Sequence, residues 1–117
     1  MNLLADLQEW YESQCDGDWE HSYGIKIGNI DNPGWEVKID LRDTELENIE
    51  FSEVSYGVGQ QAEASGDDWL LCRKVENEFD GCGGPRKLTE ILEVFLKWAQ
   101  KNQKCEQVSG GNGGQRL

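Results

Sequence analysis

The chain has 117 residues, of which 37% are hydrophobic, and this length and composition suit one folded domain with its own core. Its formal net charge of −12 disfavours binding to nucleic acid or to an anionic membrane surface. No stretch comes near the roughly 20 consecutive apolar residues that a membrane-spanning helix needs.

The charge is distributed unevenly along the chain. Residues 1–84 carry 20 acids against 5 bases, a net charge of −15, whereas residues 85–117 carry 3 acids against 6 bases, a net charge of +3. An anionic surface attracts basic proteins and speeds their association. It also keeps a protein soluble, so the charge alone leaves both interpretations open.

The start of the chain and its cysteines indicate a cellular compartment. The first 15 residues contain no Lys or Arg, unlike the basic start of a secretory signal. The four cysteines show no CxxC spacing. We therefore expect a cytoplasmic protein with reduced thiols and no cofactor.

An amphipathic helix is predicted at the start of the chain. Apolar residues recur at three- and four-residue steps from Leu3 to Tyr11, Asn2 suits the N-cap, and Gly17 suits the end of the helix. The period then changes to two over 19–27 and over 35–41. Two antiparallel strands follow, joined as a hairpin by the turn-forming residues 31–34.

Two further strands are predicted over 49–58 and 69–75, with a bulge between Phe51 and Val54, where the alternation changes phase. Residues 79–84 are expected to be a glycine-rich connector, after which a second amphipathic helix begins at Pro85. The prediction is an α+β, two-layer domain over 1–105. Its four-stranded, mainly antiparallel sheet is covered by an N-terminal and a C-terminal helix, and a disordered, Gly-rich tail occupies 106–117.

Asp16, Asp18 and Glu20 alternate as the first three ligands of a calcium loop do. Such a loop needs Gly at its sixth position, where His21 stands, and Glu at its twelfth, where Ile27 stands. A solvated acidic turn is therefore the better interpretation, and no metal site is predicted.

His21 is the only histidine of the chain. The alternation groups it with Trp19 and Tyr23 on the apolar face of the predicted strand. A hydrogen-bonded structural histidine is therefore favoured over a catalytic one.

Cys82 is the strongest candidate for catalysis, because it precedes a predicted helix N-terminus and the bases Arg86 and Lys87. Both features would lower the pKa of the thiol and favour the thiolate. The alternative function is therefore a small cysteine-dependent, sulfurtransferase-like enzyme in which the two bases hold an anionic substrate. We favour the interpretation in which Cys82 only fills space in the connector, and the prediction is a protein that is not an enzyme.

Several blocks form a longer pattern: Leu7-Gln-x-Trp-Tyr11, Gln14-Cys-Asp-Gly-Asp-Trp-Glu-His-Ser-Tyr-Gly-Ile-Lys-Ile27, Asp31-Asn-Pro-Gly-Trp35, Val37-Lys-Ile-Asp-Leu41 and Gly83-Gly-Pro85. Together they resemble the immunity protein 53 family of bacterial polymorphic toxin systems, from about residue 3 to residue 99. The resemblance implies a cytoplasmic protein that binds a cognate toxin and blocks it. It brings no catalytic residues.

The favoured hypothesis is an immunity protein that neutralises its toxin through an acidic surface. The partner would be a basic toxin domain, such as a nuclease, and the oligomeric state is left open. A structural module whose acids only confer solubility is a third hypothesis. The candidate toxin-binding residues are Asp16, Asp18, Glu20, His21, Trp35, Glu36, Asp67 and Asp68.

Overall fold

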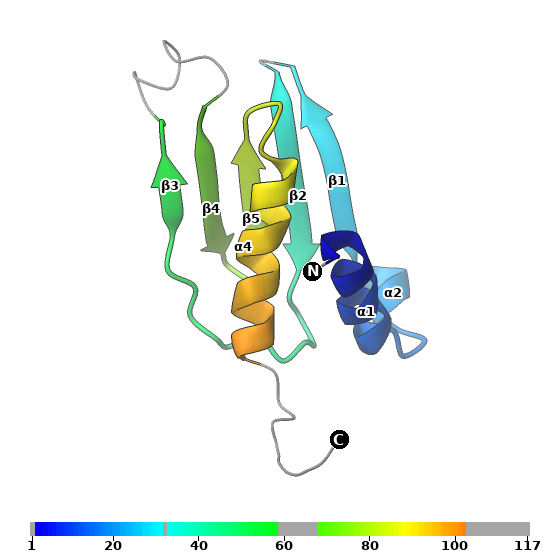
Figure 1. The fold of residues 1–117 in the computed structure, drawn as a ribbon. Coiled ribbons are helices and arrows are strands. Elements are labelled where there is room, and N and C mark those ends of the chain that lie inside the picture. The colour runs from blue at the N-terminus through cyan, green and yellow to red at the C-terminus, as the bar shows by residue number, and fades with distance from the viewer. Residues whose placement is uncertain (1, 32, 59–67, 103–117) are drawn as a thin grey trace.

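The computed structural model describes residues 2–31, 33–58 and 68–102, and Figure 1 shows their fold. Asp67 and the predicted tail lie outside the described residues. The elements follow the order α1 (Leu3–Gln14), α2 (Trp19–Ser22), β1 (Ile25–Ile30), β2 (Gly34–Asp40), β3 (Val54–Tyr56), β4 (Leu70–Val75), β5 (Glu78–Gly83) and α4 (Leu88–Lys101).

The strands form one antiparallel sheet in the order β1-β2-β5-β4-β3. Helices α1 and α4 lie side by side over one face of this sheet (Figure 1). The predicted α+β, two-layer class is confirmed, as is the hairpin of β1 and β2, and the sheet has five strands rather than four. None of the helices in the described part of the chain is long and apolar enough to cross a membrane.

The additional strand is β5, which occupies the segment predicted to be a connector. It is the central strand, paired with β2 on one side and β4 on the other. Its glycines allow α4 to pack closely over the sheet, because a Cβ on Gly81 would lie only 2.6 Å from Ile91 Cγ2. These glycines serve close packing rather than a turn.

The core lies between the sheet and the two long helices. Phe95 of α4 packs edge-on or tilted against Trp10 of α1, Phe79 of β5 and its own neighbour Trp98. Phe79 and Phe95 are fully buried, and each contributes about 1.5–3 kcal/mol through burial of its side chain. This cluster fixes α1 against α4.

Three predicted boundaries differ from the structure. Residues 19–22 are helical, so the first strand begins only at Ile25. The third strand is limited to three residues, which removes the predicted bulge. Helix α4 begins at Leu88, three residues after Pro85.

A lysine explains why residues 41–50 form turns instead of extending the third strand. The Lys74 ammonium donates to the backbone carbonyls of Leu46 (3.2 Å), Glu47 (2.7 Å) and Ile49 (2.8 Å). These bonds use all three of its donors on a single curved segment. Segment 41–50 is thereby held beside the C-terminal end of α4, where Trp98 also donates to the carbonyl of Glu50 at 3.0 Å.

Candidate functional site

Residues 15–22, which we call the capped turn, connect α1 to β1. Asp16 Oδ1 accepts hydrogen bonds from the backbone N–H groups of Asp18 (2.9 Å) and Trp19 (3.0 Å). In return, the Glu20 carboxylate accepts from the N–H groups of Asp16 (2.9 Å) and Gly17 (2.8 Å). This reciprocal arrangement satisfies the free amides before a short helix, as a capping box does.

The capping bonds stabilise the charged forms of both carboxylates. Hydrogen bonds from the N–H groups of Trp19 and Asp18 lower the pKa of Asp16. The pKa of Glu20 is lowered by its own N–H and by those of Asp16 and Gly17. Within the described residues, no group of three His, Cys, Asp or Glu side chains could hold a metal ion.

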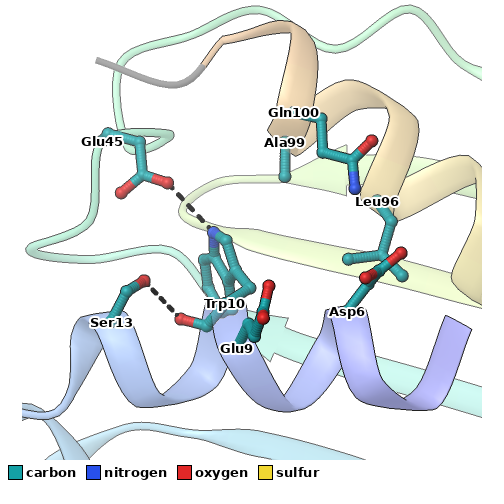
Figure 2. Close-up of a pocket in the computed structure, with 8 residues that line it drawn as sticks. All are labelled: Asp6, Glu9, Trp10, Ser13, Glu45, Leu96, Ala99 and Gln100. Atoms are coloured by element: carbon teal, nitrogen blue, oxygen red, sulfur yellow. Dashed lines mark hydrogen bonds between the residues drawn. The ribbon is translucent and has the colours of Figure 1, made fainter. Parts of the chain in front are cut away.

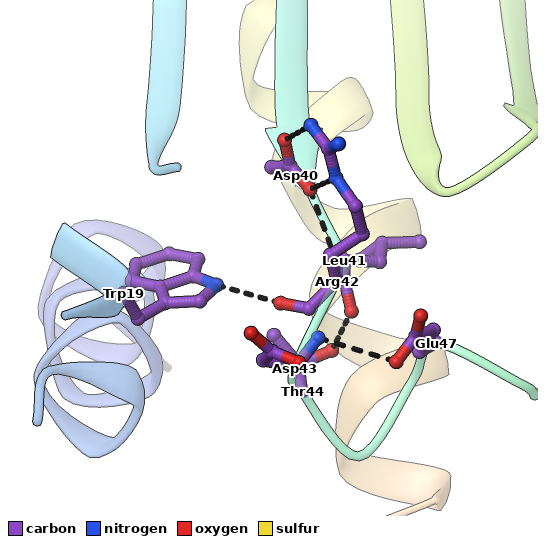
Figure 3. Close-up of polar contacts among 7 residues, drawn as sticks. All are labelled: Trp19, Asp40, Leu41, Arg42, Asp43, Thr44 and Glu47. Carbon is purple, nitrogen blue, oxygen red and sulfur yellow. Dashed lines mark hydrogen bonds and ion pairs between the residues drawn. The ribbon is translucent and has the colours of Figure 1, made fainter. Parts of the chain in front are cut away.

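Trp19 anchors the capped turn to the rest of the domain. Its side chain is 2% exposed, packs edge-on against Trp10, and donates from Nε1 to the carbonyl of Arg42 at 3.0 Å (Figure 3). The Arg42 guanidinium forms two hydrogen bonds with the Asp40 carboxylate and lies over the ring of Tyr23. Although burial opposes the effect, these bonds lower the pKa of Asp40. The position of the turn is therefore determined by both packing and polar contacts.

The structure corrects the prediction for His21. It lies on the short helix α2 and is exposed, whereas Trp19 on the same helix is buried. The alternation that grouped the two residues requires a strand, and successive helical residues instead point about 100° apart. The prediction of a structural histidine on an apolar face is therefore wrong.

The other candidate residues lie at the opposite end of β2. Trp35 is half-buried near the start of that strand and donates from Nε1 to the carbonyl of Pro85 at 3.0 Å. Asp68 forms an ion pair with Lys87 at 3.0 Å. Glu36 is the neighbour of buried Val37 in β2, so its side chain points to the sheet face opposite α4. Because β2 has seven residues, about 20 Å separates this group from the capped turn. The candidate residues therefore form two groups rather than one.

A groove that the sequence did not predict lies between α1 and α4 (Figure 2). Its volume is about 370 Å³. The Asp6 and Glu9 carboxylates extend from α1 toward α4, and the Gln100 amide extends from the other side (Figure 2). We call it the acidic groove and define it by the apolar residues Trp10, Leu96 and Ala99 and the acidic residues Asp6, Glu9 and Glu45.

Glu45 is held in place at the edge of the acidic groove. Its two carboxylate oxygens accept from Trp10 Nε1 and from Gln14 Nε2, each at 3.0 Å. Both donors belong to α1, whereas Glu45 belongs to segment 41–50. The carboxylate thus connects two elements that are distant in the sequence and keeps a fixed orientation toward the groove.

The acids of α1 and the capped turn form no ion pair with a Lys or Arg among the described residues. Within the described ranges, the ion pairs are Lys38–Asp80, Arg42–Asp40, Lys87–Asp68, Lys87–Glu90 and Lys97–Glu93. None of these pairs includes an acid from residues 2–22, a segment with six acids and no Lys or Arg. No Lys or Arg in the described part of the chain therefore forms an ion pair with an acid of this segment.

The alternative of an activated thiolate at Cys82 finds no support in the structure. The residue lies within the central strand β5, and α4 begins only at Leu88. Burial, together with the Asp80 carboxylate, raises the pKa of the Cys82 thiol. The Lys87 ammonium forms an ion pair with Asp68, so it is not available to hold an anionic substrate beside the Cys82 sulfur. The site therefore gives no support to a cysteine-dependent enzyme.

The fold and the site define a small α+β domain that is distinguished by an unpaired acidic surface rather than by a reactive side chain. The family model for immunity protein 53 matches residues 4–100. The chain therefore belongs to the immunity protein 53 family, which confirms the resemblance seen in its sequence. Membership supports an immunity function and implies a cognate toxin partner. No curated protein and no solved structure matches the chain significantly.

Proposed function

We propose that the protein acts in the cytoplasm as an immunity protein, where it binds a basic cognate toxin domain and neutralises it through the acidic surface of α1 and the capped turn. One observation supports this proposal above the others. In a member of an immunity family, six acids of residues 2–22 have no cationic partner among the described residues. A basic toxin would supply the missing positive charges.

The acids of the capped turn remain available to such a partner. Asp16 and Glu20 are hydrogen-bonded only to backbone amides, which are neutral dipoles, so both carboxylates keep their full negative charge. Asp18 and His21 are exposed on the same turn. The turn therefore presents a negative surface whose shape is fixed before the toxin arrives, which lowers the entropy cost of binding.

A nuclease is the class of toxin that this surface would inhibit most directly. An enzyme that cuts nucleic acid needs a basic cleft to hold the phosphate backbone. Fixed carboxylates can occupy that cleft and compete with the phosphates. Trp35, Glu36 and Asp68 would form a second contact area for a toxin that extends about 20 Å along β2.

The test uses the toxin domain encoded beside this gene, purified with its catalytic activity intact. We expect the full chain to bind that domain and to suppress its activity. Charge steering also predicts that the association rate falls about tenfold or more between about 0.05 M and about 0.5 M salt, while the dissociation rate changes less.

Two outcomes would contradict different parts of the proposal. If the chain neither binds nor inhibits any toxin domain encoded beside it, the immunity function is wrong. If it inhibits the toxin with an association rate that is indifferent to salt, the immunity function stands and the acidic surface is not its means.

A further inference from the structure

We infer that the acidic groove receives one long cationic side chain of the toxin, an arginine in preference to a lysine. This inference rests on the proposed function and assigns the toxin's contact to a specific place on the domain. The place lies between α1 and α4, and no residue of the capped turn lines it (Figure 2).

The groove has the two surfaces that an arginine side chain needs. The floor of the groove is apolar and consists of the nearly buried Trp10, Leu96 and Ala99, against which the three methylenes of the stem would lie. Asp6 and Glu9 lie one helical turn apart on α1, and their carboxylates extend toward the space that a guanidinium would enter (Figure 2). A volume of about 370 Å³ falls within the range of sites that enclose whole small molecules, so a single side chain fits.

The charges of the groove are suited to a cation from outside the domain. None of the ion pairs among the described residues includes Asp6, Glu9 or Glu45. Glu45 is already oriented by Trp10 and Gln14, so it would attract a cation without first losing side-chain entropy. A low-dielectric wall strengthens such an attraction relative to one in open water.

Arginine suits this site better than lysine for a geometric reason. Its guanidinium is planar and weakly hydrated, and its donors form a fork that can contact two carboxylates at once. Acids arranged along one rim match that fork, and the Gln100 amide on the α4 side offers a further polar partner. An ammonium would lose more hydration on entering the same space.

The first experiment isolates the groove from the toxin. The isotope-labelled full chain is titrated with acetyl-Gly-Arg-Gly-amide, and the indole N–H signal of Trp10 is followed by NMR. The control peptide carries citrulline, which has nearly the shape of arginine without its charge. We expect the arginine peptide to shift the Trp10 signal saturably and the citrulline peptide to leave it nearly unchanged.

Two matched variants locate the effect. D6N/E9Q removes two charges from the groove, whereas E12Q/D18N removes two charges from the same N-terminal segment outside it. We expect the arginine peptide to bind D6N/E9Q about three- to tenfold more weakly than the wild type, and to bind E12Q/D18N with less than about twofold change. The remaining NMR signals report whether each variant is folded.

The inference is overturned if the arginine peptide does not shift Trp10, if the citrulline peptide binds equally well, or if both variants lose the same affinity. The last result would show attraction to the overall charge rather than to the groove.

The second experiment separates this inference from the proposed function. With the toxin domain, the control is E50Q/E53Q, which removes two charges outside α1, the capped turn and the acidic groove. We expect D6N/E9Q to dissociate about three- to tenfold faster than E50Q/E53Q, because the groove contact is lost from the complex. If the toxin binds both variants with one dissociation rate, the groove inference is wrong and the immunity function stands. If the toxin does not bind the wild type either, the proposed function fails, and the peptide titration still judges the chemistry of the groove.

Discussion

Acidic residues in two regions of this domain have opposite surroundings. On the sheet face without helices, Asp80 of β5 lies opposite Lys38 of β2 and Arg73 of β4, and the Lys38–Asp80 pair measures 3.6 Å. On α1 and the capped turn, none of the six acids forms an ion pair among the described residues. Asp80 thus has cationic neighbours on its own sheet face, whereas the acids of the N-terminal segment form no ion pair among the described residues.

The unpaired acids also oppose local stability. Asp6, Glu9 and Glu12 follow one another at three-residue steps on α1, where each like-charge neighbour costs about 0.2–0.5 kcal/mol. The last turn of α1 carries Glu12 and no base, which is the unfavourable sign for that end of the helix dipole. A sequence that keeps charges at a cost to folding is consistent with their use in binding.

The largest effect that we predict is on the rate of association with the toxin, which should depend on acids of the N-terminal segment more than on acids of the sheet face. The variant E9Q/D18N should associate with the toxin about tenfold more slowly than the wild type at low salt, because steering depends on charges near the contact. The matched variant E78Q/D80N has the same net charge, and its rate should fall less than about threefold. Stopped-flow mixing measures both rates. Equal slowing would mean that net charge, not its location, attracts the toxin.

The second prediction concerns the free energy of unfolding, to which the acid of the sheet face should contribute more than the acid of the capped turn. Asp80→Asn should lower the free energy of unfolding by about 0.5–1 kcal/mol, since Lys38 and Arg73 lose a shared counter-charge. Asp18→Asn should leave it unchanged within about 0.5 kcal/mol. Urea unfolding at pH 7 gives both values. A larger loss for Asp18→Asn than for Asp80→Asn would contradict the pairing described for the two regions.

Local sequence patterns predict the elements whose partners are close in the chain. Asn2 was expected at the N-cap of α1, and its side chain accepts from the Ala5 N–H at 3.1 Å. The apolar periodicity of α4 and the alternation over β2 also correspond to the buried faces observed. In each case a single face meets the core, so the period of the sequence carries the information.

The missed elements depend on contacts that periodicity does not report. Gly81 and Gly83 suggested a loop, yet both are buried beneath α4 in the central strand. The spacing of Asp16 and Glu20 is a usable capping signal, but the alternation from Trp19 onward concealed the short helix behind it. The acidic groove could not be predicted, because Glu45 meets α1 only after segment 41–50 has folded back beside α4.

The third prediction concerns pH and the capped turn. The folded-state pKa values of Asp16 and Glu20 are lowered from ordinary values of 3.8 and 4.5. The two carboxylates therefore stabilise the turn above that range, and this contribution is lost as the pH falls through their lowered values. Below about pH 4, the Trp19 indole N–H should begin to exchange faster with solvent.

The Trp98 indole N–H is an internal control for that measurement. It donates to the backbone carbonyl of Glu50, which lies outside the capped turn. Asp16→Asn is the matched variant, since it keeps an oxygen acceptor for the Trp19 amide while removing the titrating carboxyl. In this variant the capped turn should open over a narrower pH range, because Glu20 is then the only one of the two carboxyls that still titrates. Parallel acceleration at Trp19 and Trp98 would indicate global unfolding and contradict a local opening.

The smallest predicted effect lies on the sheet face and concerns Cys82. Burial and Asp80 raise the pKa of its thiol from the ordinary 9.0, so little thiolate forms near neutral pH. Alkylation at pH 8, resolved for each cysteine by mass spectrometry, should proceed several-fold more slowly at Cys82 than in a free cysteine peptide. Asp80→Asn should speed it about twofold, because one of the causes that raise the pKa is removed while burial remains. Reaction faster than the peptide would instead indicate an activated thiolate and contradict the raised pKa.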